Sequence, residues 1–257
     1  AVFGYILAAF PVVEVIINLP VPENWTNIYS PTAATAITLV CLMLFAMGGR
    51  IIAAATSGAL RARGLSVFNP AQPELEKPGI LLLALLVIVE TGQFPEIVSS
   101  FLSAAVACIV LVRLVRWRVF SIRDHSVLSL HLGYAWLAVG FLLKAAAPYV
   151  SGFTSTDILH ALTVGALGTL TLAVMVRIIL QRARRPVTPG LLGLTPVALV
   201  TVAALLRILA PLTEIWLDVV TLAAISWSAA FLVFIVFLLR EGPLGNRSTH
   251  PKRGRWS

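Results

Sequence analysis

The sequence predicts an all-α, polytopic transmembrane helix bundle with about eight spans and both termini in the cytoplasm. Of its 257 residues, 59% are apolar and only 12% are charged, and the mean hydropathy is +0.95. Soluble domains of this length do not have such a composition, whereas multi-pass membrane proteins do. The apolar residues also fall into separate runs, most of them long enough to cross a bilayer.

The apolar runs define the expected spans in chain order. A span needs roughly 17–25 mostly apolar residues, and only the third run is short. Gly92 and Pro95 interrupt the chain there, so the third and fourth runs could instead form one broken or re-entrant element. The expected spans cover residues 2–19, 32–55, 79–92, 95–115, 127–147, 155–180, 189–210 and 214–239.

Basic residues support this count because they occur in every second connection. The connections between them contain no Lys or Arg, and an error of one span would scramble the alternation. The positive-inside rule therefore places the basic connections and both termini in the cytoplasm. The basic residues after spans two, four and six are Arg61, Arg63 and Lys77, then Arg113, Arg116, Arg118 and Arg123, then Arg177, Arg182, Arg184 and Arg185.

The chain is expected to form one transmembrane domain over residues 1–240, followed by a basic cytoplasmic tail over 241–257. The formal charge of +8 is accounted for by the short basic loops and this tail, so the predicted partner is the lipid bilayer and not a nucleic acid. Cys41 and Cys108 both lie in apolar runs and do not form a disulfide framework. Because the chain starts at Ala1 inside an apolar segment, we expect a fragment or a processed product.

Two of the predicted spans carry a histidine, and polar side chains inside a bilayer are candidates for function. His131 lies about one turn from the cytoplasmic end of span five, and His160 about one turn from the other end of span six. With a rise of about 1.5 Å per residue their depths differ by roughly 18 Å, too far for two ligands of one iron. Imidazole binds haem iron and other metals, so His131 and His160 are predicted metal ligands at separate sites. The alternative is a core histidine bonded to a neighbouring hydroxyl or carbonyl.

Two arginines are predicted to lie at the same depth as His131. Arg50 and Arg177 would bind the carboxylates of a haem whose iron His131 holds, because guanidinium groups pair with carboxylates in a bidentate way. The alternative is that each arginine extends to the nearby interface.

A second polar group of mixed charge is predicted towards the opposite side. It suits a proton path, a copper site or a plain ion-pair network, and the sequence does not separate these. Asp157, three residues before His160, either orients the imidazole or caps the helix. The members of this group are Glu14, Glu90, Lys144, His160 and Asp218.

Small residues also recur at helical spacing in span six, at Ala161, Gly165, Thr169 and Ala173, which predicts the close approach of another helix. The chain has no phosphate loop, paired-cysteine metal motif, nucleophile elbow or dinucleotide fingerprint, so no catalytic residue is predicted.

The segments just discussed also carry a family resemblance. HALTVGALGTLTLAVMVR, residues 160–177, closely resembles the most distinctive motif of the NnrS family. LHLGYAWLAVG, residues 130–140, looks like the family's other histidine helix, and GGRIIAAATSGALRARG, residues 48–64, is similar to its glycine-arginine segment. RILA at 207–210 and WSAAF at 227–231 fit more weakly, and the resemblance runs from about residue 32 to residue 239.

The resemblance implies a multi-pass protein of the bacterial inner membrane that binds haem and copper and accompanies the response to nitric oxide. The family is not known as an enzyme in the strict sense. Carried over residue by residue, His131 and His160 match its histidines, and Arg50, Arg177 and Arg207 match its arginines.

The sequence departs from the family pattern in three places, one of which is near Ala53, where the proline that often follows the glycine-arginine segment is replaced. The family usually has about twelve spans with additional histidines in its first part, and a glycine-histidine stretch often follows the arginine of span six, where this chain reads IILQRARRPV. These departures favour a second hypothesis, a cofactor-free accessory or structural subunit of a larger respiratory or photosynthetic membrane complex. A third hypothesis, a proton or ion transporter, would use the mixed-charge group.

Overall fold

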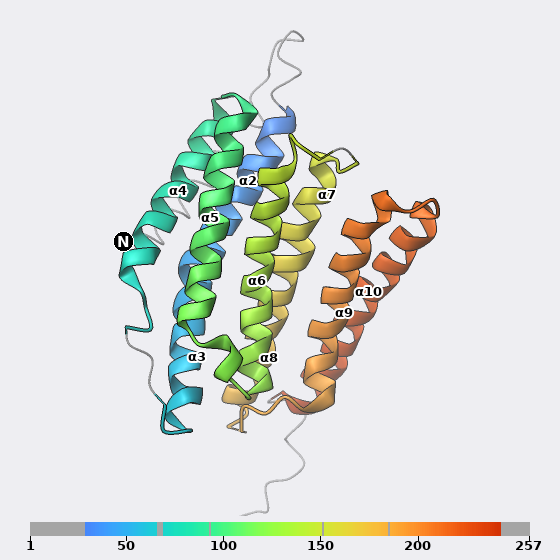
Figure 1. Ribbon diagram of the computed structural model, residues 1–257. Helices are drawn as coiled ribbons and strands as arrows, with labels where there is room; N and C mark the ends of the chain where they lie inside the picture. Colours follow the sequence, from blue (N-terminus) through green and yellow to red (C-terminus); the bar gives the residue numbers. More distant parts are fainter. Residues whose placement is uncertain (1–28, 66–68, 93, 151, 185, 243–257) are drawn as a thin grey trace, which may run out of the picture.

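The computed structural model describes residues 29–65, 69–92, 94–150, 152–184 and 186–242, and over these ranges it contains helices and turns but no strand. The long helices lie side by side as one bundle (Figure 1). In chain order the elements are α2 (Tyr29–Met43), η2 (Leu44–Gly48), α3 (Gly49–Arg61), α4 (Pro73–Thr91), α5 (Glu96–Arg116), η3 (Val119–Ser121), α6 (His125–Ala146), α7 (Ser155–His160), η4 (Ala161–Gly168), α8 (Thr169–Arg182), α9 (Gly190–Leu209), η5 (Ala210–Leu212) and α10 (Trp216–Glu241).

Six helices in the described part of the chain are long and apolar enough to cross a membrane, so the expected number of about eight is not confirmed. The predicted first span, 2–19, lies outside the described residues. The predicted third span is α4, which is longer than expected because it begins at Pro73 and takes up the charged segment Glu74–Lys77. α4 and α5 form two separate helices packed on each other, as the two-span interpretation requires. The orientation of the termini stays a prediction. The six helices are Ala33–Arg61, Glu96–Ser121, His125–Ala146, Ser155–Arg182, Gly190–Leu212 and Trp216–Glu241.

Two of the long helices change from α-helix to π-helix part-way along their length. Between α2 and α3 the chain forms the π-helix η2, and between α7 and α8 it forms the longer π-helix η4. Such wide turns are rare, and they are frequent at functional sites. η4 begins at the residue after His160, so that histidine marks the junction between the two windings.

α6 lies at the centre of the bundle and packs against α3, α5, η4 and α8. Glycines make these contacts close: a Cβ at Gly133 would stand 2.8 Å from the backbone nitrogen of Leu170, and one at Gly165 would stand 2.6 Å from the Trp136 ring. The small-residue face predicted for span six is therefore a packing surface. Its four members, Ala161, Gly165, Thr169 and Ala173, are all buried.

α9 and α10 form a hairpin at one side of the bundle (Figure 1). It packs on η4 and α8. At the end of the hairpin near the start of α9, a Cβ at Gly193 would stand 3.0 Å from Phe237 and 3.2 Å from Val176, so α8, α9 and α10 meet closely there. This contact holds the hairpin beside the helix Ser155–Arg182, which carries His160.

Candidate functional site

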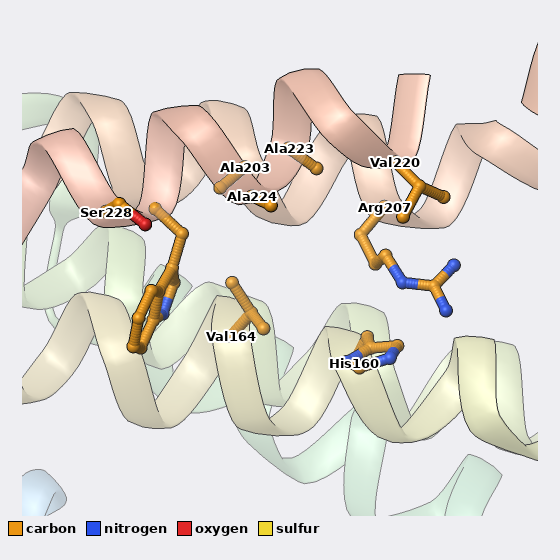
Figure 2. Close-up of a pocket in the computed structure, with 9 residues that line it drawn as sticks. His160, Val164, Ala203, Arg207, Val220, Ala223, Ala224 and Ser228 are labelled. Carbon is orange, nitrogen blue, oxygen red and sulfur yellow. The ribbon is translucent and has the colours of Figure 1, made fainter. Parts of the chain in front are cut away.

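A groove of about 400 Å³ lies between the continuous helix α7–η4–α8, which carries His160, and the α9–α10 hairpin. Figure 2 shows His160 and Arg207 facing each other at one end, Val164 further along, and Ser228 towards the other end. Three alanines from α9 and α10 keep one wall flat, and Trp227 adds a large ring. The lining residues are His160, Val164, Ala203, Arg207, Val220, Ala223, Ala224, Trp227 and Ser228.

His160 is held at the groove by the first turn of its helix. The side chain of Thr154 accepts from the backbone N–H of Asp157 (3.3 Å), while Asp157 Oδ2 accepts from the Thr154 backbone N–H (3.0 Å) and hydroxyl (2.7 Å). This capping box satisfies N–H groups that a helix start leaves open. Of the two roles predicted for Asp157, the structure shows the cap. Both carboxylate oxygens are engaged, because Oδ1 accepts from Arg207 Nη1 at 3.2 Å.

The His160 ring is half-buried, and among the described residues it has no hydrogen-bond partner. It therefore presents to the groove an imidazole that faces Arg207.

His131 has a different environment. It is almost fully buried in α6, its Nε2 lies 2.9 Å from Thr56 Oγ1, and its ring meets the edge of Trp117 with 5.7 Å between centroids. Its Nδ1 has no partner within the described part of the chain. These contacts are those of a histidine packed in the core and bonded to a hydroxyl. His131 and His160 face different helices, and the structure does not bring them together.

The two arginines predicted beside His131 have partners elsewhere. Arg50 donates from Nε (3.1 Å) and Nη2 (3.0 Å) to Glu76 Oε1, and 60% of its side chain is exposed. Arg177 donates from Nη1 to Ser126 Oγ at 3.1 Å. The role of both in cofactor binding stays a prediction.

Sequence reasoning missed Arg113. It was assigned to a basic connection, but it lies in α5 and is fully buried. Its guanidinium carbon stands 4.8 Å from the ring centre of Phe45, 5.0 Å from that of Trp117 and 5.7 Å from that of Tyr134. Its Nη1 donates to Tyr134 Oη at 2.8 Å. Aromatic faces attract a cation, and they surround this one.

One sequence signal pointed to Arg113. A Cβ at Gly49 would stand 2.7 Å from Arg113 Nη2, so the second glycine of Gly48-Gly49 leaves the room that the guanidinium fills. Arg113 thus joins α3, α5 and α6 next to the His131 contacts.

The predicted mixed-charge group is divided. Lys144 donates to Glu90 Oε1, which also accepts from the Thr38 hydroxyl at 3.1 Å, and both charged side chains are largely buried. His160 lies instead with Asp157 and Arg207, and Asp218 is exposed in the first turn of α10. Glu14 lies outside the described residues. A proton path through this group stays a prediction.

Comparison with protein families identifies the chain. The model of the NnrS protein family matches residues 1–240. The chain belongs to the NnrS family. No curated protein and no solved structure shows significant similarity to it.

The segment that most resembles the NnrS family is also the one that builds the groove wall. Residues 160–177 contain His160, all of η4 and the first part of α8. The groove is open and lined mainly by apolar side chains, whereas the His131 ring is enclosed in the core and contacts Thr56 and Trp117. No group of three or more His, Cys, Asp or Glu side chains that could hold a metal ion gathers in the described ranges.

Proposed function

We propose that this NnrS-family protein binds haem in the groove beside His160, with the imidazole as an iron ligand. The observation that carries the proposal is an imidazole that has no hydrogen-bond partner among the described residues and lies at the edge of an apolar groove. Neutral imidazole is a common haem ligand, and cofactor sites are mostly apolar clefts with a few polar groups. The groove, with its alanine wall and Trp227, has that composition.

The proposed role follows from family membership together with the groove. An iron held by one side-chain ligand keeps a position for a small diatomic ligand. We propose that the bound haem serves the response to nitric oxide in the bacterial inner membrane. His160 would supply the ligand, and the surrounding apolar residues would limit the access of water to the iron.

The other predicted site residues have a weaker case. His131 is bonded to Thr56, and Arg50 is bonded to Glu76. We propose that His131 stabilises the core and is not required for the haem at His160. Copper, which the family resemblance also implies, stays a prediction.

The test is the absorption spectrum of detergent-purified protein from haem-replete cells. The wild type should show a Soret band that shifts when nitric oxide is added to the reduced protein. His160→Ala should lose most of the band, and His131→Gln should retain it. Because the His160 ring makes no hydrogen bond within the described structure, His160→Ala should keep its helical circular dichroism.

Two results would count against the proposal. A Soret band that survives His160→Ala but disappears in His131→Gln would move the haem to the buried histidine. A wild type without a Soret band that copurifies with other membrane subunits would favour the accessory-subunit hypothesis instead.

A further inference from the structure

The groove carries its charge at one end only. Arg207 and His160 stand together there, and every other lining side chain is apolar or, at Ser228, a neutral hydroxyl (Figure 2). A ligand that lies along the groove therefore meets a guanidinium, itself paired with Asp157, at one end and uncharged side chains along the rest of the groove.

One partner holds the Arg207 side chain in place, and further hydrogen-bond donors of its guanidinium remain for a ligand. Within the described part of the chain its one hydrogen bond runs from Nη1 to Asp157 Oδ1 at 3.2 Å, and 23% of its side chain is exposed. Among the described residues, no acceptor is recorded for its Nε or Nη2. A guanidinium has five N–H donors in a planar fork, so donors remain for an incoming anion.

Asp157 fixes the orientation of the Arg207 guanidinium. Its side chain is only 6% exposed, and its other oxygen belongs to the cap of α7. The carboxylate is thus fixed by the helix start, and it fixes one nitrogen of Arg207 in turn. The remaining donors are presented at the groove end without the disorder of a free arginine.

We propose that the groove selects ligands with an apolar body and a carboxylate edge, and that Arg207 binds the carboxylate. This inference rests on the proposed function for the identity of the natural ligand, which would be haem with its propionates. It goes beyond that function because it assigns the carboxylate-recognising residue and the orientation of the ligand in the groove.

A purely structural role for Arg207 makes a different prediction. If Arg207 only ties α9 to α7, its removal weakens the binding of every ligand of the groove equally. If Arg207 reads a carboxylate, its removal weakens only ligands that carry one.

The experiment uses metal-free protoporphyrin IX and its dimethyl ester, which differ only in the carboxylates. Binding to the purified full chain in detergent is followed by porphyrin fluorescence. The preference is the dissociation constant of the ester divided by that of the acid. Because both porphyrins partition into the same detergent with every variant, the change in preference between variants cancels that partition.

Arg207→Met should reduce the preference about tenfold, the size expected for a charge-assisted hydrogen bond, and should leave ester binding unchanged. Since Arg207→Met strands the Asp157 carboxylate, the double variant Arg207→Met/Asp157→Asn removes both charges together and should show the same reduction. Arg116→Met is the control. Arg116 pairs with Glu74, both side chains are 49% exposed, and neither lines the groove, so the preference should stay at the wild-type value.

The outcomes separate this inference from the proposed function. If neither porphyrin changes its affinity in Arg207→Met and in the double variant, Arg207 does not bind the carboxylate, although a His160-dependent Soret band would still support haem binding. If acid and ester lose affinity equally, Arg207 has only the structural role. If the wild type binds neither porphyrin, both the inference and the proposed groove are wrong.

Discussion

Replacing Gly133 by alanine tests the close packing of α6 on the backbone of α8. A Cβ at Gly133 would lie 2.8 Å from the backbone nitrogen of Leu170 and 2.9 Å from its Cα, whereas ordinary contacts begin at 3.4 Å. The atoms in the way are backbone atoms of α8, so the new methyl group has to separate two helices by about half an ångström. Overpacking of this kind costs about 1–3 kcal/mol.

Gly58→Ala is a matched control for this change. Gly58 lies in α3, and a Cβ there would meet nothing within 4 Å. Both substitutions gain the same helix propensity, about 1 kcal/mol, so it cancels when the two variants are compared. Gly58→Ala should be more stable than Gly133→Ala by about 1–3 kcal/mol, which is the packing cost alone.

The assay is the free energy of unfolding in mixed micelles, obtained from the loss of helical circular dichroism as denaturing detergent is added. Gly133→Ala should unfold earlier than the wild type, and Gly58→Ala should unfold at the same point or later. Two variants that agree within about 0.5 kcal/mol would refute the close packing of α6 on α8, because the close approach would then have no energetic consequence.

Further substitutions test two of the buried polar contacts. Thr56→Val leaves the ring nitrogen of His131 buried without its partner and should cost about 1–3 kcal/mol in the same unfolding assay, while Thr56→Ser should recover most of the loss; equal stability of the valine and serine variants would contradict the hydrogen bond. Asp157→Asn weakens the bond to Arg207 and the helix cap together and should cost about 1–3 kcal/mol, between the values for exposed and buried pairs. Glu74→Gln, which breaks a half-exposed pair, should cost less than about 1 kcal/mol, and an equal effect of the two carboxylate changes would show that the burial of Asp157 has no consequence.

The helical fold follows from the sequence because long apolar runs in a chain with few charged residues are typical of transmembrane helices. The ends of the helices are harder to predict where a helix includes charged residues. α4 begins at Pro73 and includes Glu74–Lys77, although charged residues are not expected inside a membrane span. Both glutamates of this segment have partners: Glu76 accepts from Arg50, and Glu74 accepts from Arg116. Hydropathy cannot register such pairs.

The candidate site was predicted only in part for a similar reason. His160 and its capping residue Asp157 are local in sequence and were identified from their spacing. The partners of His131, however, come from α3 and from the end of α5, and the partner of Arg50 comes from α4. Arg113 was the clearest omission. A basic residue near a helix end normally marks a membrane interface, and only the folded positions of Phe45 and Tyr134 show that this one is enclosed.

The proposed function depends most directly on the bond between His160 and haem iron. The decisive measurement is the Soret absorption of the His160→Ala protein, titrated with haem in the presence and absence of added imidazole. We predict that the variant binds haem poorly alone and that imidazole restores a wild-type spectrum at one haem per chain, because the free ring occupies the place of the missing side chain. A variant that binds haem with the wild-type spectrum and affinity without imidazole would contradict the assignment of His160 as the ligand.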